Sequence, residues 1–273
     1  MNNHTEQNET VIGSSCAERK NLRAFELDFL RGIAIVMMMF MHFSYDVRYE
    51  FGVDTFDYLE SRWFWEFVHP IIIVLFVGLS GICCTFSRNN FKRGLKLLCV
   101  ALTFTTVTFI VTRYMGIYCL ILFNVLHMLS VSTLIYAFIE YVSRKMDIKD
   151  SVISFVLGLM GIYIIILNNH LDYYDGLSSN MFLMPFGIDV KGEPSVADYM
   201  PLIPWLGVFL TAASLGRMVY PEKKTIFPNV KECVRKIFRP FEVLGRHSLL
   251  IYIIHQPVIY AVLYLIFKLL GRV

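Results

Sequence analysis

Apolar residues gather in seven long runs along the chain, and short polar segments separate the runs. Each run approaches the roughly 20 residues that an α-helix needs to cross a bilayer. The predicted spans are 26–46, 67–86, 95–111, 117–139, 152–167, 199–219 and 248–270. This pattern predicts an all-α fold, a polytopic transmembrane helix bundle of about seven spans.

Helix-breaking residues and polarity set the limits of these spans. Residues 113–116 are predicted to form a tight break between the third and fourth spans. Pro201 and Pro204 fall near the first turn of the sixth span, where proline is well tolerated. Residues 1–24 are polar and predict a disordered cytoplasmic tail, which leaves 25–273 as one transmembrane domain.

Charged residues alternate in sign from one connecting segment to the next. Basic residues lie before span one and in the segments that join spans two and three, four and five, and six and seven. They include Arg19, Lys20, Arg23, Arg88, Lys92, Arg93, Lys96, Arg144, Lys145, Lys149, Lys231, Arg235, Lys236, Arg239 and Arg246. The intervening segments are rich in Asp and Glu. The positive-inside rule therefore places the N-terminus in the cytoplasm and the C-terminus outside.

The composition agrees with a membrane protein. Hydrophobic residues make up 56% of the chain and aromatic residues 15%, which is unlike an ordinary soluble domain. We therefore expect the lipid bilayer as a partner and no nucleic acid. The six cysteines include no CxxC motif and no metal-ligand spacing, so we expect neither a disulfide framework nor a bound metal.

The first span carries its polar side chains along one stripe. Arg31 and His42 are eleven residues apart and point within about 20° of each other. Asp28 and Asp46 are eighteen residues apart, which is five whole turns. Ionisable groups in a spanning helix are costly and usually face a bundle interior or a water-filled cavity. These four residues are catalytic candidates, although an interfacial Asp28–Arg31 pair and a packing role for His42 remain open.

A second candidate region follows the second span. The small residues of 78–81 allow a helix or a ligand to approach the backbone closely. Basic side chains in the next segment could bind the phosphates of a nucleotide-like donor, although positive residues in cytoplasmic loops are also the topological default. The candidates for donor binding are Ser80, Gly81, Arg88, Lys92 and Arg93.

Five segments together suggest a family. They are FELDFLRGIAIVMMMFMHFSYD, FVGLSGICCTFSRNNFKRGLKL, FNVLHMLSVS, DYMPLIPWLGVFLTAASLGR and LGRHSLLIYIIHQP. Between about residues 24 and 258 the chain resembles bacterial membrane proteins grouped with the heparan-α-glucosaminide N-acetyltransferase catalytic domain. The spacing of Arg31 and His42 is also similar to the first helix of acyltransferase family three.

This resemblance implies a membrane enzyme that uses acyl-CoA, such as acetyl-CoA, as co-substrate and modifies a sugar or glycan. It implies an integral protein of the bacterial cytoplasmic membrane, with His42 as the catalytic residue and Arg88 and Arg93 in the basic loop. Further site candidates are His69, Asn124, His127, Trp205, Ser248 and His255. The chain has fewer spans than those enzymes, and the histidine at this position is not general among the lysosomal relatives.

Three functions therefore compete. The first is an acyltransferase that moves an acyl group from acyl-CoA to a sugar hydroxyl or amine, with His42 as general base. The second is a proton-coupled transporter, because His and Asp within spans also mark proton relays. The third is a non-catalytic membrane scaffold subunit. The resemblance favours the first.

The charge alternation generates a topological prediction. Reporter fusions after Arg93, after Asp175, after Lys231 and at Val273 should report the cytoplasm, the outside, the cytoplasm and the outside. A fusion at Val273 that reports the cytoplasm would contradict seven spans.

Overall fold

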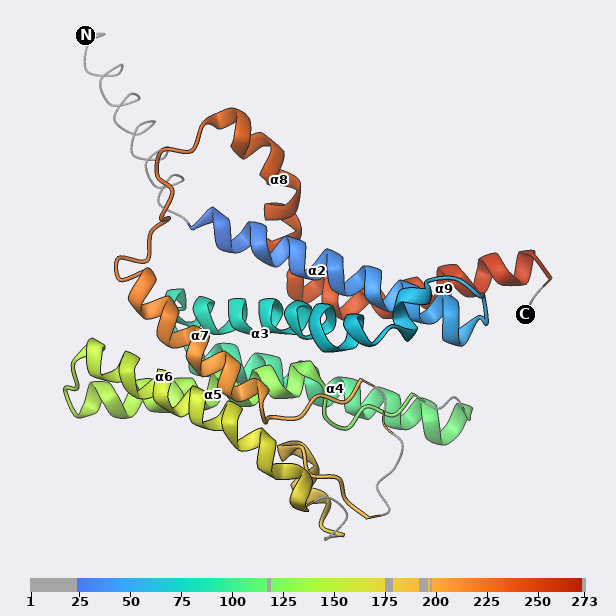
Figure 1. Cartoon of the computed structure of the whole chain (residues 1–273), viewed down its shortest axis with the longest axis horizontal. Helices are drawn as coiled ribbons and strands as arrows, with labels where there is room; N and C mark the ends of the chain where they lie inside the picture. The colour runs from blue at the N-terminus through green and yellow to red at the C-terminus, as the bar shows by residue number, and fades with distance from the viewer. Residues whose placement is uncertain (1–23, 117–118, 175–178, 192–195, 197, 272–273) are drawn as a thin grey trace, which may run out of the picture. The chain divides into compact units, whose positions relative to one another are not determined.

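A computed structural model describes residues 24–116, 119–174, 179–191, 196 and 198–271 (Figure 1). The predicted disordered tail therefore lies outside the described residues, apart from Ala24. The described part of the chain is helical and contains no strand, which confirms the predicted fold class.

Six helices in the described residues are long and apolar enough to cross a membrane. They are α2 (Phe25–Tyr45), α3 (His69–Phe86), α4 (Asn90–Met115), α5 (Val125–Lys145), α6 (Asp150–Leu167) and α9 (Ser248–Leu269). A seventh apolar helix, α7 (Trp205–Val219), is shorter. These seven helices correspond in order to the seven predicted spans.

The helix ends correct several predicted boundaries. Helix α4 continues through Arg113, and the break comes at Gly116, whose left-handed φ of 70° ends the helix. Helix α5 begins at Val125 rather than at residue 117, because Asn124 caps its first turn. Helix α7 begins after Pro204, later than predicted. A further helix, α8 (Glu232–Arg246), lies where only a basic loop was expected.

The chain divides into two compact units. The first unit comprises residues 1–76 and 222–273, and the second comprises 77–221. In the first unit, α2 packs against both α8 and α9 (Figure 1). In the second, α4 packs against α5 and α6 against α7.

Helices α2 and α8 approach closely because glycine stands at the contact. A Cβ on Gly32 would collide with the carbonyl group of Phe241, and a Cβ on Gly245 would collide with the carbonyl group of Asp28. Phe29 fills the space beside this contact, since its ring lies 4.4 Å from that of Phe238 and 5.7 Å from that of Phe241. The contact fixes the start of α2 against α8.

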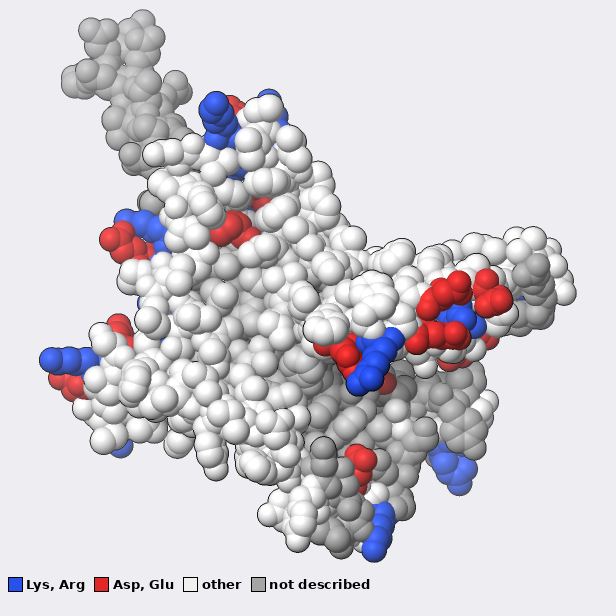
Figure 2. Space-filling view, in the orientation of Figure 1, with Lys and Arg blue, Asp and Glu red and all other residues white. Residues whose placement is uncertain are grey.

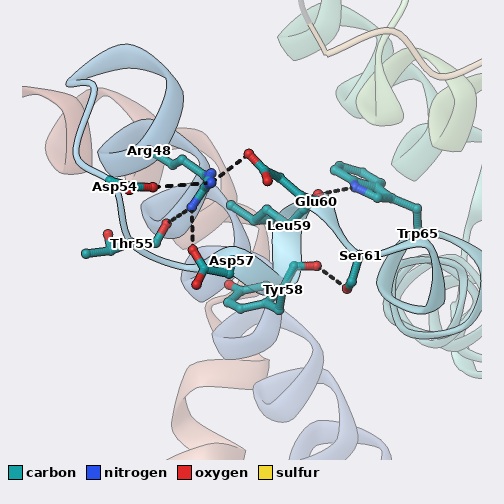
Figure 3. A network of polar contacts seen from close by, with 9 residues as sticks. All are labelled: Arg48, Asp54, Thr55, Asp57, Tyr58, Leu59, Glu60, Ser61 and Trp65. Atoms are coloured by element: carbon teal, nitrogen blue, oxygen red, sulfur yellow. Dashed lines mark hydrogen bonds and ion pairs between the residues drawn. The ribbon is translucent and has the colours of Figure 1, made fainter.

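The segment that follows α2 is folded around Arg48 (Figure 3). This residue lies in the π-helical turn η1 (Asp46–Glu50), and its guanidinium bonds Thr55 O, Asp57 Oδ1 and Glu60 Oε1 at 2.5, 3.0 and 2.6 Å. The Arg48 side chain is only 10% exposed, although the carboxylates around it are exposed. Arg48 therefore ties down a turn rich in acidic residues next to α2.

Short helical turns complete the connections. In the first unit they are η2 (Asp57–Glu60) and η3 (Phe64–Val68), and in the second η4 (Asn168–Tyr174) and η5 (Met181–Phe186). The segment after η1 packs Phe51 and Phe56 against the apolar cluster of Val47, Leu263 and Phe267. This packing joins the end of α2 to the end of α9. In the predicted topology both ends lie on the outer side of the membrane.

The second unit is also built on close glycine contacts. Gly161 of α6 and Gly207 of α7 leave no room for a Cβ on either side, because each would meet the other's carbonyl oxygen. Gly81 of α3 lies against the backbone of Phe209 in α7 in the same way. The small residues of 78–81 thus serve helix packing here, which is one of the two roles predicted for them.

Candidate functional site

Two histidines meet where α2 and α9 face each other within the first unit. The imidazole rings of His42 and His255 lie with centroids 5.1 Å apart and are tilted by 57°. His255 is buried, and His42 is partly exposed. The structure therefore joins the main catalytic candidate from the sequence to a residue predicted only as a further candidate.

A carboxylate lies one helical turn beyond His42. Asp46 is 2% exposed, and both of its oxygens accept hydrogen bonds from Nε2 of Gln256, at 3.1 and 3.0 Å. A carboxylate in an apolar setting needs such donors, because an unpaired buried charge is costly. The carbonyl oxygen of Gln256, Oε1, is buried and accepts no hydrogen bond from the described residues.

The hydrogen bonds of His255 define which of its nitrogens is basic. Nδ1 lies 2.7 Å from the carbonyl oxygen of Tyr252. A carbonyl oxygen can only accept, so Nδ1 carries the proton. In the neutral ring Nε2 is then the nitrogen with a free electron pair, which is the state required of a general base.

His69 adds a third imidazole to this region. It is the first residue of α3 and belongs to the same unit as His42. Its ring contacts the indole of Trp65 at 4.9 Å, and the Trp65 indole N–H donates to Leu59 O at 2.6 Å. We refer to His42, Asp46, His69, His255 and Gln256 as the histidine site.

The polar stripe of α2 therefore separates into two parts. At its start, Asp28 is 4% exposed and pairs with Arg246 of α8, with Nε and Oδ2 3.3 Å apart. The same guanidinium pairs with Glu242 at 3.2 Å. Asp28 thus has a structural ion pair about 27 Å along the helix from Asp46, at 1.5 Å per residue. Arg31 is partly exposed and lies between these two groups.

In the second unit, Arg93 turns back onto α3. Its guanidinium donates to Ser80 Oγ at 3.2 Å and contacts Cys84 Sγ at 3.5 Å. Arg88 and Lys92 are exposed. Two predicted donor-binding residues, Ser80 and Arg93, are therefore in contact, whereas the backbone of α7 fills the space beside Gly81.

His127 has a local role in the second unit. Its backbone N–H donates to the Asn124 side chain, and its Nδ1 accepts from Asn124 N at 3.3 Å, which completes a capping box at the start of α5. Its other nitrogen bonds Thr105 Oγ1 at 3.1 Å. His127 therefore stands in the first turn of α5 and not in mid-span, and its ring is fully engaged.

The remaining candidates begin helices. Trp205 is the first residue of α7, and Ser248 is the first residue of α9. Among the described residues, no three His, Cys, Asp or Glu side chains gather as metal ligands would. Gln256 was not predicted as a site residue. Its place between His255 and Pro257, as a polar residue within a spanning helix, indicated a possible role.

The chain matches a known protein family over most of its length. A family described as heparan-alpha-glucosaminide N-acetyltransferase, catalytic, matches residues 23–257. The match covers most of the chain, and the chain belongs to this family of transferases. Searches of curated proteins and of solved structures gave no match.

The capping role of His127 can be tested by replacement. His127→Ala should lower the free energy of unfolding by about 1–2 kcal/mol, because Asn124 N loses its acceptor in the capping box and Thr105 loses its partner. Thermal unfolding in detergent measures the change. His170→Ala, which alters an exposed histidine, is the control. A His127→Ala protein that melts normally but loses activity would contradict the structural role.

Proposed function

We propose that the protein is an integral membrane acyltransferase that moves an acyl group, in the first instance acetyl, from acyl-CoA to a hydroxyl or amine of a sugar or glycan. The family supports the acetyltransferase class. The observation that supports the location of the chemistry is the contact between the rings of His42 and His255, beside a buried carboxylate.

In this proposal His42 is the general base. An acceptor O–H or N–H attacks the thioester carbonyl, the new C–O or C–N bond forms, and the C–S bond breaks to release coenzyme A as the thiolate. The imidazole takes the acceptor's proton and returns it to the leaving sulfur. A positioned imidazole suits both steps, because its protonation changes near neutral pH.

The neighbours of His42 have separate roles. The ring of His255 lies against that of His42 and its Nδ1 is held by Tyr252 O, so His255 orients His42 and can share the proton. Asp46, held by Gln256, stabilises the positive charge that forms on the imidazoles. The buried Oε1 of Gln256 offers an acceptor for the substrate's own N–H or O–H.

The donor is proposed to bind through the basic segment of the second unit. Coenzyme A carries phosphate groups, and guanidinium groups bind phosphate through paired hydrogen bonds. Arg93 has no carboxylate partner among the ion pairs of the described residues, and it is anchored by the neutral Ser80. Exposed Arg88 and Lys92 supply further positive charge.

Replacement of His42 tests the proposed catalytic role. His42→Ala should reduce acyl transfer by about 10² to 10⁴, because a general base contributes about that much, and it should leave expression and donor binding intact. Asp46→Asn should lose less, since the imidazole remains. Acyl transfer from labelled acetyl-CoA and thermal unfolding should be measured on the same preparations.

His42→Asn separates catalysis from packing. Asparagine keeps hydrogen bonding but cannot serve as a base near neutral pH. A His42→Asn protein with normal turnover would mean that His42 is structural, and the search for a base would move to His255 and His69.

Replacement of the two arginines tests the donor site. The double variant Arg88→Gln and Arg93→Gln should weaken acetyl-CoA binding about tenfold or more, because each charge-assisted hydrogen bond contributes about 1.5–3 kcal/mol. Calorimetry in detergent measures the binding. Lys145→Gln with Lys149→Gln, which removes two exposed charges elsewhere in the second unit, is the control. Unchanged binding by the arginine variant would rule out this donor site.

A further inference from the structure

Helix α8 presents three different surfaces. At about 100° per residue, Phe238, Phe241 and Gly245 point toward one side, and this side packs on α2. The two other sides face away from this contact, apart from Arg235, which reaches back to Phe25 of α2. They differ in chemical character, because one is apolar and the other is cationic.

One of these sides is apolar and is exposed. It consists of Cys233, Ile237, Pro240 and the half-buried Leu244. Ile237 is 67% exposed. A continuous exposed apolar surface on a short helix costs free energy in water, so it normally meets a partner or a lipid phase.

The third side is cationic. Arg235, Lys236 and Arg239 fall within about 100° on the helix, and Lys236 and Arg239 are exposed. Arg235 is held with its guanidinium 5.5 Å from the centre of the Phe25 ring, which aligns this side with the start of α2. Figure 2 shows Lys and Arg atoms near the upper end of α8, whereas most of the visible surface of this helix is uncharged.

The position of α8 in the chain limits what can meet these surfaces. Helix α9 begins at Ser248, directly after the end of α8 at Arg246, so α8 lies at the end of an apolar helix long enough to span. Its six charged residues over 15 positions make it too polar to span. The glycine contact with Asp28 and Gly32 also holds α8 against the first turns of α2.

We propose that α8 is an interfacial helix that binds anionic lipid headgroups. The apolar side, with Ile237 at its centre, enters the boundary between headgroups and acyl chains. The cationic side, with Lys236 and Arg239, binds phosphate groups at the surface. An amphipathic helix with apolar and basic sides binds membranes in this way, and the charge selects anionic lipids.

An anionic lipid surface fits the two sides of α8 better than an acidic protein partner does. A protein partner would have to cover an apolar side and a cationic side that lie about 100° apart around one helix. A bilayer surface offers both environments at once, separated by a few ångströms. The helix already stands at the start of α9, so it reaches that boundary without rearrangement.

A pair of labelled variants tests the orientation of α8. Ile237→Cys and Lys236→Cys, each made in a background whose other cysteines are replaced by Ala or Ser, carry an environment-sensitive fluorophore in liposomes containing phosphatidylglycerol. We expect a blue-shifted emission at position 237, quenched by lipids with a shallow nitroxide, and emission typical of water at 236. Emission typical of water at both positions would overturn the proposal.

A second measurement keeps the native cysteines. Phosphatidylglycerol is titrated into the protein in detergent, the rise in melting temperature gives an apparent affinity, and phosphatidylcholine serves as the zwitterionic comparison. Lys236→Gln with Arg239→Gln should weaken the affinity by about fivefold for each charge removed. The control, Lys145→Gln with Lys149→Gln, should weaken it much less.

Each outcome of the titration decides the proposal. A selective loss in the α8 variant supports lipid binding by this helix. An equal loss in both pairs would mean a diffuse charge effect and would overturn it, as would an unchanged affinity in the α8 variant, which would point to a cytosolic partner instead. None of these results depends on whether the protein transfers acyl groups.

Discussion

Polar groups in a membrane-spanning helix must find partners within the protein, and this constraint organises the first unit. Helix α2 and the turn η1 directly after it carry three buried carboxylates, and each is satisfied by the final part of the chain. Thr225 Oγ1 and Ile226 N donate to Glu26, Arg246 pairs with Asp28, and Gln256 donates to Asp46. The start and the end of the chain are therefore held together by the groups that are most costly to leave unpaired.

The same pairing gives the two ends of α2 different characters. At its start, the ion pair with Arg246 and the close glycine contact fix α8 against the helix. Near its other end, the donor to Asp46 is the uncharged amide of Gln256, and the rings of His42 and His255 meet one turn away. An amide donor satisfies a carboxylate without a full positive charge beside it. In the proposed mechanism the histidines gain and lose protons beside this amide-bound carboxylate.

Much of the fold could be predicted because apolar run lengths report spanning helices directly. Run length did not predict α8, because charged residues interrupt its apolar residues, such as Phe238 and Phe241, and no long apolar run forms. The spacing of Phe238, Phe241 and Gly245 was nevertheless a helical signal. The start of α5 was misplaced because apolar residues continue up to Asn124, and only the capping interaction with His127 ends the loop.

The candidate site was predicted in part. The stripe argument found His42 and Asp46, because residues on one helix have fixed relative directions. It could not find their contacts with His255 and Gln256, since helix periodicity says nothing about which distant helix packs opposite. For the same reason it grouped Asp28 with Asp46, although Asp28 has its own partner on α8.

In the proposed function, His42 and His255 act together in acyl transfer. A double-mutant cycle of His42→Ala and His255→Ala, measured as the rate of acyl transfer, tests it most directly. If the two imidazoles work as a unit, the double variant should be about as slow as the slower single variant, because residues that act as a unit are not additive. Losses that simply multiply would mean that the two residues act independently, and would contradict the claim.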